Sequence, residues 1–104
     1  MVSDRHPYDI PKRRQAALDA LCEHLIATGE QPIDPATNRW LAEAEAVARD
    51  AASDGISPDA QTKRIQQVQM LLESADEISE PTAAAHVAAA VDCCVQLLSE
   101  NDSE

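Results

Sequence analysis

Hydrophobic positions recur at intervals of three and four residues in four segments of the chain, which is the spacing of helices with one apolar face. Leu18, Leu21 and Leu25 mark this face in the first segment, and Ile65 and Val68 mark it in the third. No stretch alternates between apolar and polar residues as a half-buried strand does. The pattern predicts four helices, over 11–28, 35–54, 58–78 and 81–99.

Residues typical of helix ends lie at the predicted boundaries. Three helices are expected to begin at an acidic or hydroxyl residue followed by proline, at Asp34–Pro35, Ser57–Pro58 and Glu80–Pro81. Proline suits the first turn because its missing N–H has no helical partner there. Gly29 and Gly55 are expected to end the first two helices, and Gly29 suits a left-handed C-terminal cap.

The fourth segment has the heptad-like spacing of a bundle helix, with steps of three and four residues. Its predicted apolar stripe consists of Ala84, Val87, Val91, Cys94 and Leu98. The short loops favour antiparallel neighbours. We therefore expect an all-α fold in one domain over 1–104, with flexible polar tails at 1–8 and 100–104. This fold is an antiparallel up-down four-helix bundle, or two helical hairpins completed by dimerisation.

Small side chains limit the core that one chain can build. Alanine fills many positions of the predicted apolar faces, and phenylalanine is absent. A domain of this size also buries a modest share of its surface. We therefore expect a homodimer. Trp40, the single tryptophan, is expected at the edge of the core or at an interface, where tryptophan is enriched.

The net charge of the chain gives information about the environment in which the protein is folded. The chain has 19 acidic and 8 basic residues, for a formal net charge of -11. Such acidity can accompany disorder, but the periodic apolar residues and helix caps indicate an ordered chain. Concentrated salt screens repulsion between surface carboxylates. High Asp and Glu, scarce Lys and abundant Ala resemble the small acidic cytoplasmic proteins of haloarchaea. This resemblance is compositional and implies no site residues.

Candidate chemical groups are few. Cys93 and Cys94 are adjacent, so they lack the spacing of a zinc pair and are poorly placed for a mutual disulfide. Cys22 and Cys94 are interpreted as small core residues in a reducing compartment. His86 has no acidic residue three or four positions away, and His24 follows Glu23 directly, so neither fits a Glu-x-x-His metal motif. We predict no metal, no cofactor and no catalytic residue.

Acidic residues gather at one predicted helix–loop corner. Asp76, Glu77 and Glu80 are close in sequence and offer oxygen ligands for a divalent cation. In a chain with so many carboxylates, a solvated surface explains this cluster better.

The N-terminal segment differs from the rest of the chain because it is basic. Arg5, Lys12, Arg13 and Arg14 are half of the eight basic residues. Arg13 and Arg14 are predicted in the first turns of a helix, where cations gain nothing from the helix dipole. We therefore expect them to contact an acidic patch of this chain or of a second copy, and we place Trp40, Arg13 and Arg14 at a possible interface.

Function is weighed between two classes. The favoured hypothesis is a non-enzymatic helical interaction module that acts as a homodimer or a protein adaptor. The alternative is a nucleic-acid-associated regulator that uses the basic N-terminal segment, although the overall negative charge makes nucleic acid an unlikely partner. The longest apolar run, Ala83 to Val91, is shorter than a membrane span and is interrupted by His86. We therefore expect a cytoplasmic protein without membrane contact.

Overall fold

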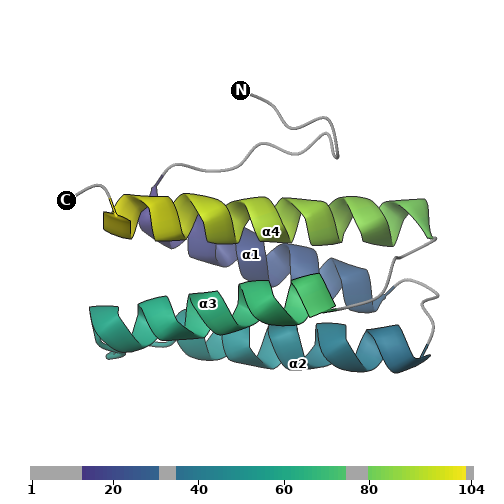
Figure 1. Cartoon of the computed structure of the whole chain (residues 1–104), viewed down its shortest axis with the longest axis horizontal. Coiled ribbons are helices and arrows are strands. Elements are labelled where there is room, and N and C mark those ends of the chain that lie inside the picture. Colours follow the sequence, from purple (N-terminus) through teal and green to yellow (C-terminus); the bar gives the residue numbers. More distant parts are fainter. Residues whose placement is uncertain (1–12, 31–34, 75–79, 103–104) are drawn as a thin grey trace.

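The computed structural model describes residues 13–30, 35–74 and 80–102, and these form four helices with no strand among them. The helices run alternately up and down and lie side by side (Figure 1). This confirms the predicted all-α four-helix bundle. Their bounds are Arg14–Gly29 for α1, Pro35–Ala51 for α2, Pro58–Ser74 for α3 and Pro81–Asp102 for α4.

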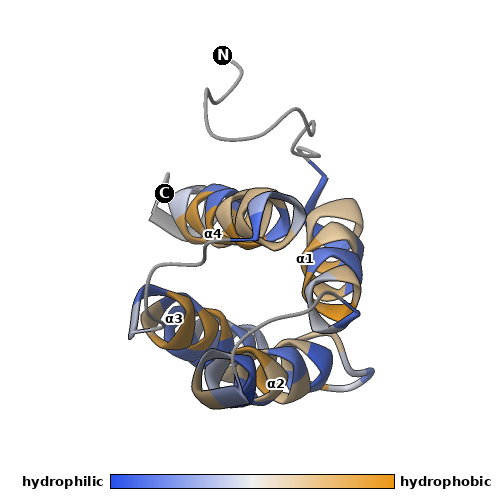
Figure 2. Cartoon of the chain, turned by 90° about the vertical axis from the view of Figure 1, so that its right-hand side faces the viewer, coloured by the Kyte–Doolittle hydropathy of each residue, from blue (hydrophilic) through white to orange (hydrophobic). Residues whose placement is uncertain are grey.

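The helices pack in a ring in which each contacts two neighbours. The closest packing joins α1 to α4 and α2 to α3, while α1 with α2 and α3 with α4 make smaller contacts. Seen along the bundle, the four helices surround one common interior (Figure 2). The molecule is therefore built from two tightly packed antiparallel pairs, α1/α4 and α2/α3.

Two predicted N-terminal caps are present. The Ser57 hydroxyl accepts a hydrogen bond from the Ala60 backbone N–H at 3.2 Å, at the start of α3. The Glu80 carboxylate accepts one from the Ala83 N–H at 2.7 Å, at the start of α4. Each cap satisfies an N–H group that has no partner inside its helix. The predicted cap Asp34 lies outside the described residues.

The two glycines behave differently from each other. Gly55 has φ of 82°, a left-handed conformation that glycine adopts without steric cost. Gly29 is the last residue of α1 and does not have a positive φ. The N–H of the next residue, Glu30, instead donates to Ala27 O at 3.2 Å and closes the last turn. The left-handed cap predicted at Gly29 is wrong.

Three predicted helix ends shift. Arg13 is extended, with φ of -75° and ψ of 135°, so α1 begins at Arg14 and not at Pro11. The second helix ends at Ala51, three residues before the predicted end, because the chain forms a turn at Ser53. Its N–H and its hydroxyl both donate to Asp50 O, at 3.2 and 2.7 Å. The fourth helix continues beyond residue 99 to Asp102, so this part of the expected C-terminal tail is helical. The predicted end of the third helix at 78 lies outside the described residues.

The core combines leucines of α1 and α2 with smaller residues of α4. Leu21, Leu25 and Leu41 are almost fully buried. The buried residues of α4 are Ala83, Ala89, Ala90, Cys93, Cys94 and Leu97. Of the stripe predicted on this helix, Cys94 is fully buried, and Val87, Val91 and Leu98 only border the core. The predicted stripe is therefore rotated from the true one, which repeats every seven residues at Ala83, Ala90 and Leu97.

Candidate functional site

The fourth helix is unusual because much of its apolar surface is not buried against the described part of the chain. Residues Pro81–Ser99 are long and apolar enough to cross a membrane by length and composition, yet 33% of this stretch is buried. The core helix of a soluble protein can pass the same test, so this property alone is weak evidence for a membrane span. What it does show is a helix with apolar residues on its outward side as well as its inward side.

The outward apolar residues form a continuous strip. Ala84, Ala88, Val91 and Val95 are separated by steps of four, three and four, so they lie along one side of α4. Ala84, Ala88 and Val91 are half-buried, Val91 also borders the core, and Val95 is 46% exposed. We call these four residues the α4 outer strip. Between Pro81 and Ser99 the only acidic residue is Asp92, and there is no Lys or Arg.

Other exposed apolar side chains lie on different helices. Trp40 on α2 is 41% exposed, Ile26 on α1 is 40% exposed and Met70 on α3 is 63% exposed. Trp40, predicted at the core edge or at an interface, therefore lies partly outside the core. Single exposed apolar residues are normal on protein surfaces. The strip on α4 differs from them because several apolar residues follow one another along one helix.

The two arginines predicted at an interface have different environments. Arg13 is exposed and precedes α1, where its carbonyl accepts a hydrogen bond from Ala17 N–H at 2.8 Å. Arg14 is half-buried, and its Nε donates to Gln61 Oε1 at 2.7 Å. Its terminal nitrogen lies 3.4 Å from Leu97 O at the end of α4. Arg14 thus has neutral oxygens of its own chain as partners. Arg5 and Lys12 lie outside the described residues, so a nucleic-acid arm stays a prediction.

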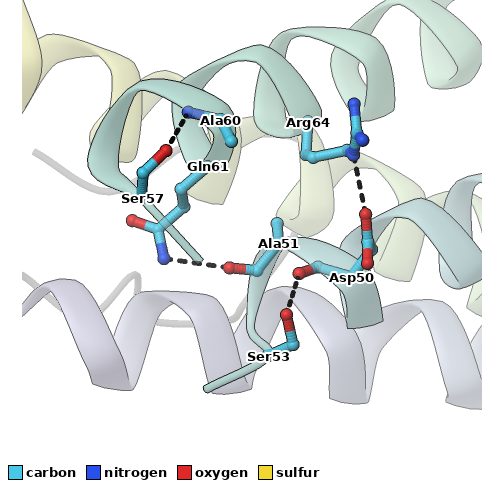
Figure 3. Close-up of polar contacts among 7 residues, drawn as sticks. All are labelled: Asp50, Ala51, Ser53, Ser57, Ala60, Gln61 and Arg64. Carbon is cyan, nitrogen blue, oxygen red and sulfur yellow. Dashed lines mark hydrogen bonds and ion pairs between the residues drawn. The ribbon is translucent and has the colours of Figure 1, made fainter. Parts of the chain in front are cut away.

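Polar contacts link all four helices at the end of the bundle where α1 and α3 begin. Gln61 of α3, which accepts from Arg14 of α1, also donates to Ala51 O at 2.9 Å, at the end of α2 (Figure 3). Through Leu97 O, Arg14 reaches α4 as well. The bond from Gln61 satisfies the carbonyl of Ala51, the last residue of α2, which has no partner in its own helix.

A histidine pair joins the middle of α1 to α4. His24 Nδ1 and His86 Nδ1 are 2.9 Å apart, and the two ring centroids are 5.2 Å apart with an angle of 42° between the ring planes. Both side chains are half-buried. Sequence reasoning missed this pair because it considered each histidine only with its neighbours along one helix, and the two lie 62 residues apart. The antiparallel pairing of the first and last helices was the signal that could have brought them together.

The cysteines have the environment of core residues. Cys93 and Cys94 are fully buried, and burial raises the pKa of each thiol to about 12. The carboxylates of Asp92 for Cys93 and Glu73 for Cys94 act in the same direction. Cys22 is half-buried, and desolvation followed by the charge of Asp19 raises its pKa. A thiol that stays protonated is a poor nucleophile and a poor metal ligand.

The predicted acidic corner is described only in part. Glu80 caps α4, and Asp76 and Glu77 lie outside the described residues. Among the residues that are placed, no three or more His, Cys, Asp or Glu side chains gather as a metal site. Glu80 therefore has a structural role whether or not the corner binds a cation.

The fold and contacts define an antiparallel four-helix bundle with a polar network at one end and an uncovered apolar strip on its last helix. The family described as "Domain of unknown function (DUF8152)" matches residues 17–104, and the chain belongs to it. The match begins within α1 and takes in both helix pairs. No curated protein and no solved structure shows significant similarity to the chain.

Proposed function

We propose that this protein is a non-enzymatic helical interaction module that forms a homodimer through the α4 outer strip. The observation that supports this proposal is the low burial of the apolar Pro81–Ser99 stretch within one chain. Association buries apolar surface of this kind and is driven by the hydrophobic effect. An adaptor role toward another protein is the broader version of the same proposal.

Charge favours a second copy of the chain as the occupant of this surface. The protein has a net charge of -11, so two copies repel each other wherever carboxylates meet. The α4 outer strip contains no charged residue, and Asp92 is the single carboxylate of the stretch Pro81–Ser99, so two copies that meet there bring few carboxylates together. A strongly anionic partner such as nucleic acid offers no complementary group to this face.

The shape of the strip suits helix-to-helix contact. Two of its four residues are alanines, which let neighbouring helix backbones approach closely. The 22-residue helix is about 33 Å long at 1.5 Å per residue. In a two-fold dimer, α4 packs against α4 of the second copy, because a two-fold axis makes one strip serve both sides. Heptad-like spacing of 84, 88, 91 and 95 fits this kind of packing.

The experiment is sedimentation equilibrium of the untagged protein across a KCl series from 0.1 to 3 M. The proposal expects a mass twice the 11.2 kDa of one chain, with tighter association at higher salt. Salt screens the repulsion between copies, and concentrated salt does not weaken apolar burial as it weakens ion pairs. Nucleic-acid binding through basic residues has the opposite salt dependence.

Matched substitutions separate the strip from other exposed apolar residues. The double variant Ala88→Glu/Val95→Glu should sediment as a monomer and keep its helical circular dichroism. Met70→Glu adds a charge at a more exposed apolar residue on α3 and should remain dimeric. A monomeric wild type at micromolar concentrations in every salt would exclude the dimer. Binding of the wild type to phosphatidylcholine vesicles, lost in the double variant, would instead assign the strip to a membrane surface.

The setting that we propose for this module is a salt-rich cytoplasm. The excess of acidic over basic residues supports it, since such a surface tolerates molar salt while remaining hydrated. The raised pKa values of Cys93 and Cys94 support the non-enzymatic assignment, because neither thiol is activated.

A further inference from the structure

The His24–His86 contact is a meeting of two metal-binding side chains across the most closely packed helix pair. The Nδ1 atoms lie 2.9 Å apart, which is the distance of a hydrogen bond from one neutral ring to the other. The same nitrogen–nitrogen distance is also compatible with two nitrogens that bind one metal ion. Two nitrogens that bind one metal ion at about 2.0–2.1 Å lie about 2.9 Å apart at a right angle and about 3.3 Å apart at a tetrahedral angle.

We propose that His24 and His86 form a two-histidine site for a divalent transition-metal ion such as Zn²⁺, which clamps α1 to α4. This inference does not depend on self-association, because both ligands belong to one chain. Imidazole is the ligand that Zn²⁺, Cu²⁺ and Ni²⁺ share as a preferred donor. In the described part of the chain no further His, Cys, Asp or Glu completes a larger cluster, so water molecules supply the remaining ligands.

Ion binding replaces the hydrogen bond without net loss of a proton. In the neutral pair, one ring has its proton on Nδ1 and the other on Nε2. When both Nδ1 atoms bind the ion, the first ring moves its proton from Nδ1 to Nε2. The rings must also turn, because their centroids are now 5.2 Å apart with the nitrogens pointing toward each other. Their lone pairs then converge on an ion placed beside the present nitrogen–nitrogen line.

Small side chains flank the pair on both helices. Ala20 and Ala27 lie one helical turn from His24, and Ala83 and Ala90 lie one turn from His86. Both histidines are half-buried, so solvent reaches the site and can supply the water ligands. Thr28 Oγ1 donates to His24 O at 2.8 Å, which ties down the backbone turn that holds the first ligand.

The test uses the untagged full-length protein with uniformly ¹⁵N-labelled histidine and ZnCl₂ as the probe. Long-range ¹H–¹⁵N spectra resolve the ring nitrogens of the three histidines, and His6 serves as an internal reference. Potassium nitrate sets the ionic strength, because chloride at molar concentration competes for Zn²⁺. We expect the Nδ1 signals of His24 and His86 to shift together and saturate at one ion per chain. Addition of EDTA should reverse the shifts.

Variants identify the ligands independently of the spectra. His24→Gln and His86→Gln should each weaken Zn²⁺ binding more than about tenfold in competition with a fluorescent chelator. His6→Gln should bind Zn²⁺ as the wild type does. The double variant Ala88→Glu/Val95→Glu should also retain the site, so that failure of the dimer and failure of the metal site are distinguishable. Histidine signals that do not shift in the wild type, or equal affinity in all three histidine variants, would overturn the proposal.

Discussion

The two helix pairs of this bundle use different means to join their members. In the α2/α3 pair, charged and polar side chains at the surface connect the helices. Arg64 Nε lies 2.7 Å from Asp50 Oδ2, and Gln61 donates to Ala51 O (Figure 3). In the α1/α4 pair, α4 contributes alanines, cysteines and one leucine to the core, and a histidine pair joins the helices.

The contrast separates two ways of treating an outward helix face. A helix with a polar outer face needs no partner to cover that face, because water solvates it. A helix with apolar residues on its outer face gains free energy when something covers them. The α2/α3 pair has the separate exposed apolar residues Trp40 and Met70, while α4 has several apolar residues along one side and is the part of the molecule best suited to take part in an interaction.

The largest expected effect on stability comes from shortening a buried side chain of α4. Leu97→Ala should lower the free energy of unfolding by about 2–5 kcal/mol, because Leu97 is fully buried and its removal leaves a cavity. Leu98→Ala is the matched control, and its loss should be smaller because Leu98 only borders the core. Denaturant unfolding followed by circular dichroism measures both.

The same variant tests whether the two pairs unfold together. Trp40 is the only tryptophan and reports on α2, while all three cysteines lie in α1 and α4. In a two-state bundle, Trp40 fluorescence and the exposure of Cys93 to a thiol reagent give the same midpoint. An α1/α4 transition at lower denaturant than the Trp40 transition would show that the two pairs unfold separately.

An intermediate effect is expected from overfilling the contact between α1 and α4. Ala90→Leu should lower the free energy of unfolding by about 1–3 kcal/mol, because Ala90 is fully buried and a larger side chain forces the helices to shift. Ala46→Leu places the same side chain at an exposed position of α2, where the change should stay within about 0.5 kcal/mol. If both variants had equal stability, α1 and α4 would not be closely packed at Ala90.

How much of this structure follows from the sequence depends on the range of the interactions. The helices and the caps at Ser57 and Glu80 depend on neighbouring residues, and the sequence predicts them. The stripe on α4 was predicted in a rotated position, because nearly every residue from Ala83 to Val91 is apolar. Spacing alone then fits several faces, and contact with α1 and α3 selects one.

Interactions between distant residues could not be predicted. Arg14 donates to Gln61, which lies 47 residues away on the helix diagonally across the bundle. The offset between helix ends brings these two side chains together, and no residue pattern along one helix encodes that offset. The His24–His86 pair depends in the same way on the register of α1 against α4.

The smallest expected effect concerns the ion pair that joins α2 to α3. Asp50 and Arg64 are 56% and 44% exposed, so solvent screens their attraction. A double-mutant cycle with Asp50→Asn and Arg64→Gln should give a coupling free energy of about 0.2–1 kcal/mol in 0.1 M KCl. The cycle is needed because Asp50→Asn alone also reduces the net negative charge, which relieves repulsion elsewhere. In 1 M KCl the coupling should fall toward zero, since the screening length shortens to about 3 Å. A coupling that persisted at 1 M KCl would mean that the pair is held more rigidly than its exposure indicates. The α2/α3 surface would then retain its polar link at high salt, in the same conditions in which we expect α4 to self-associate.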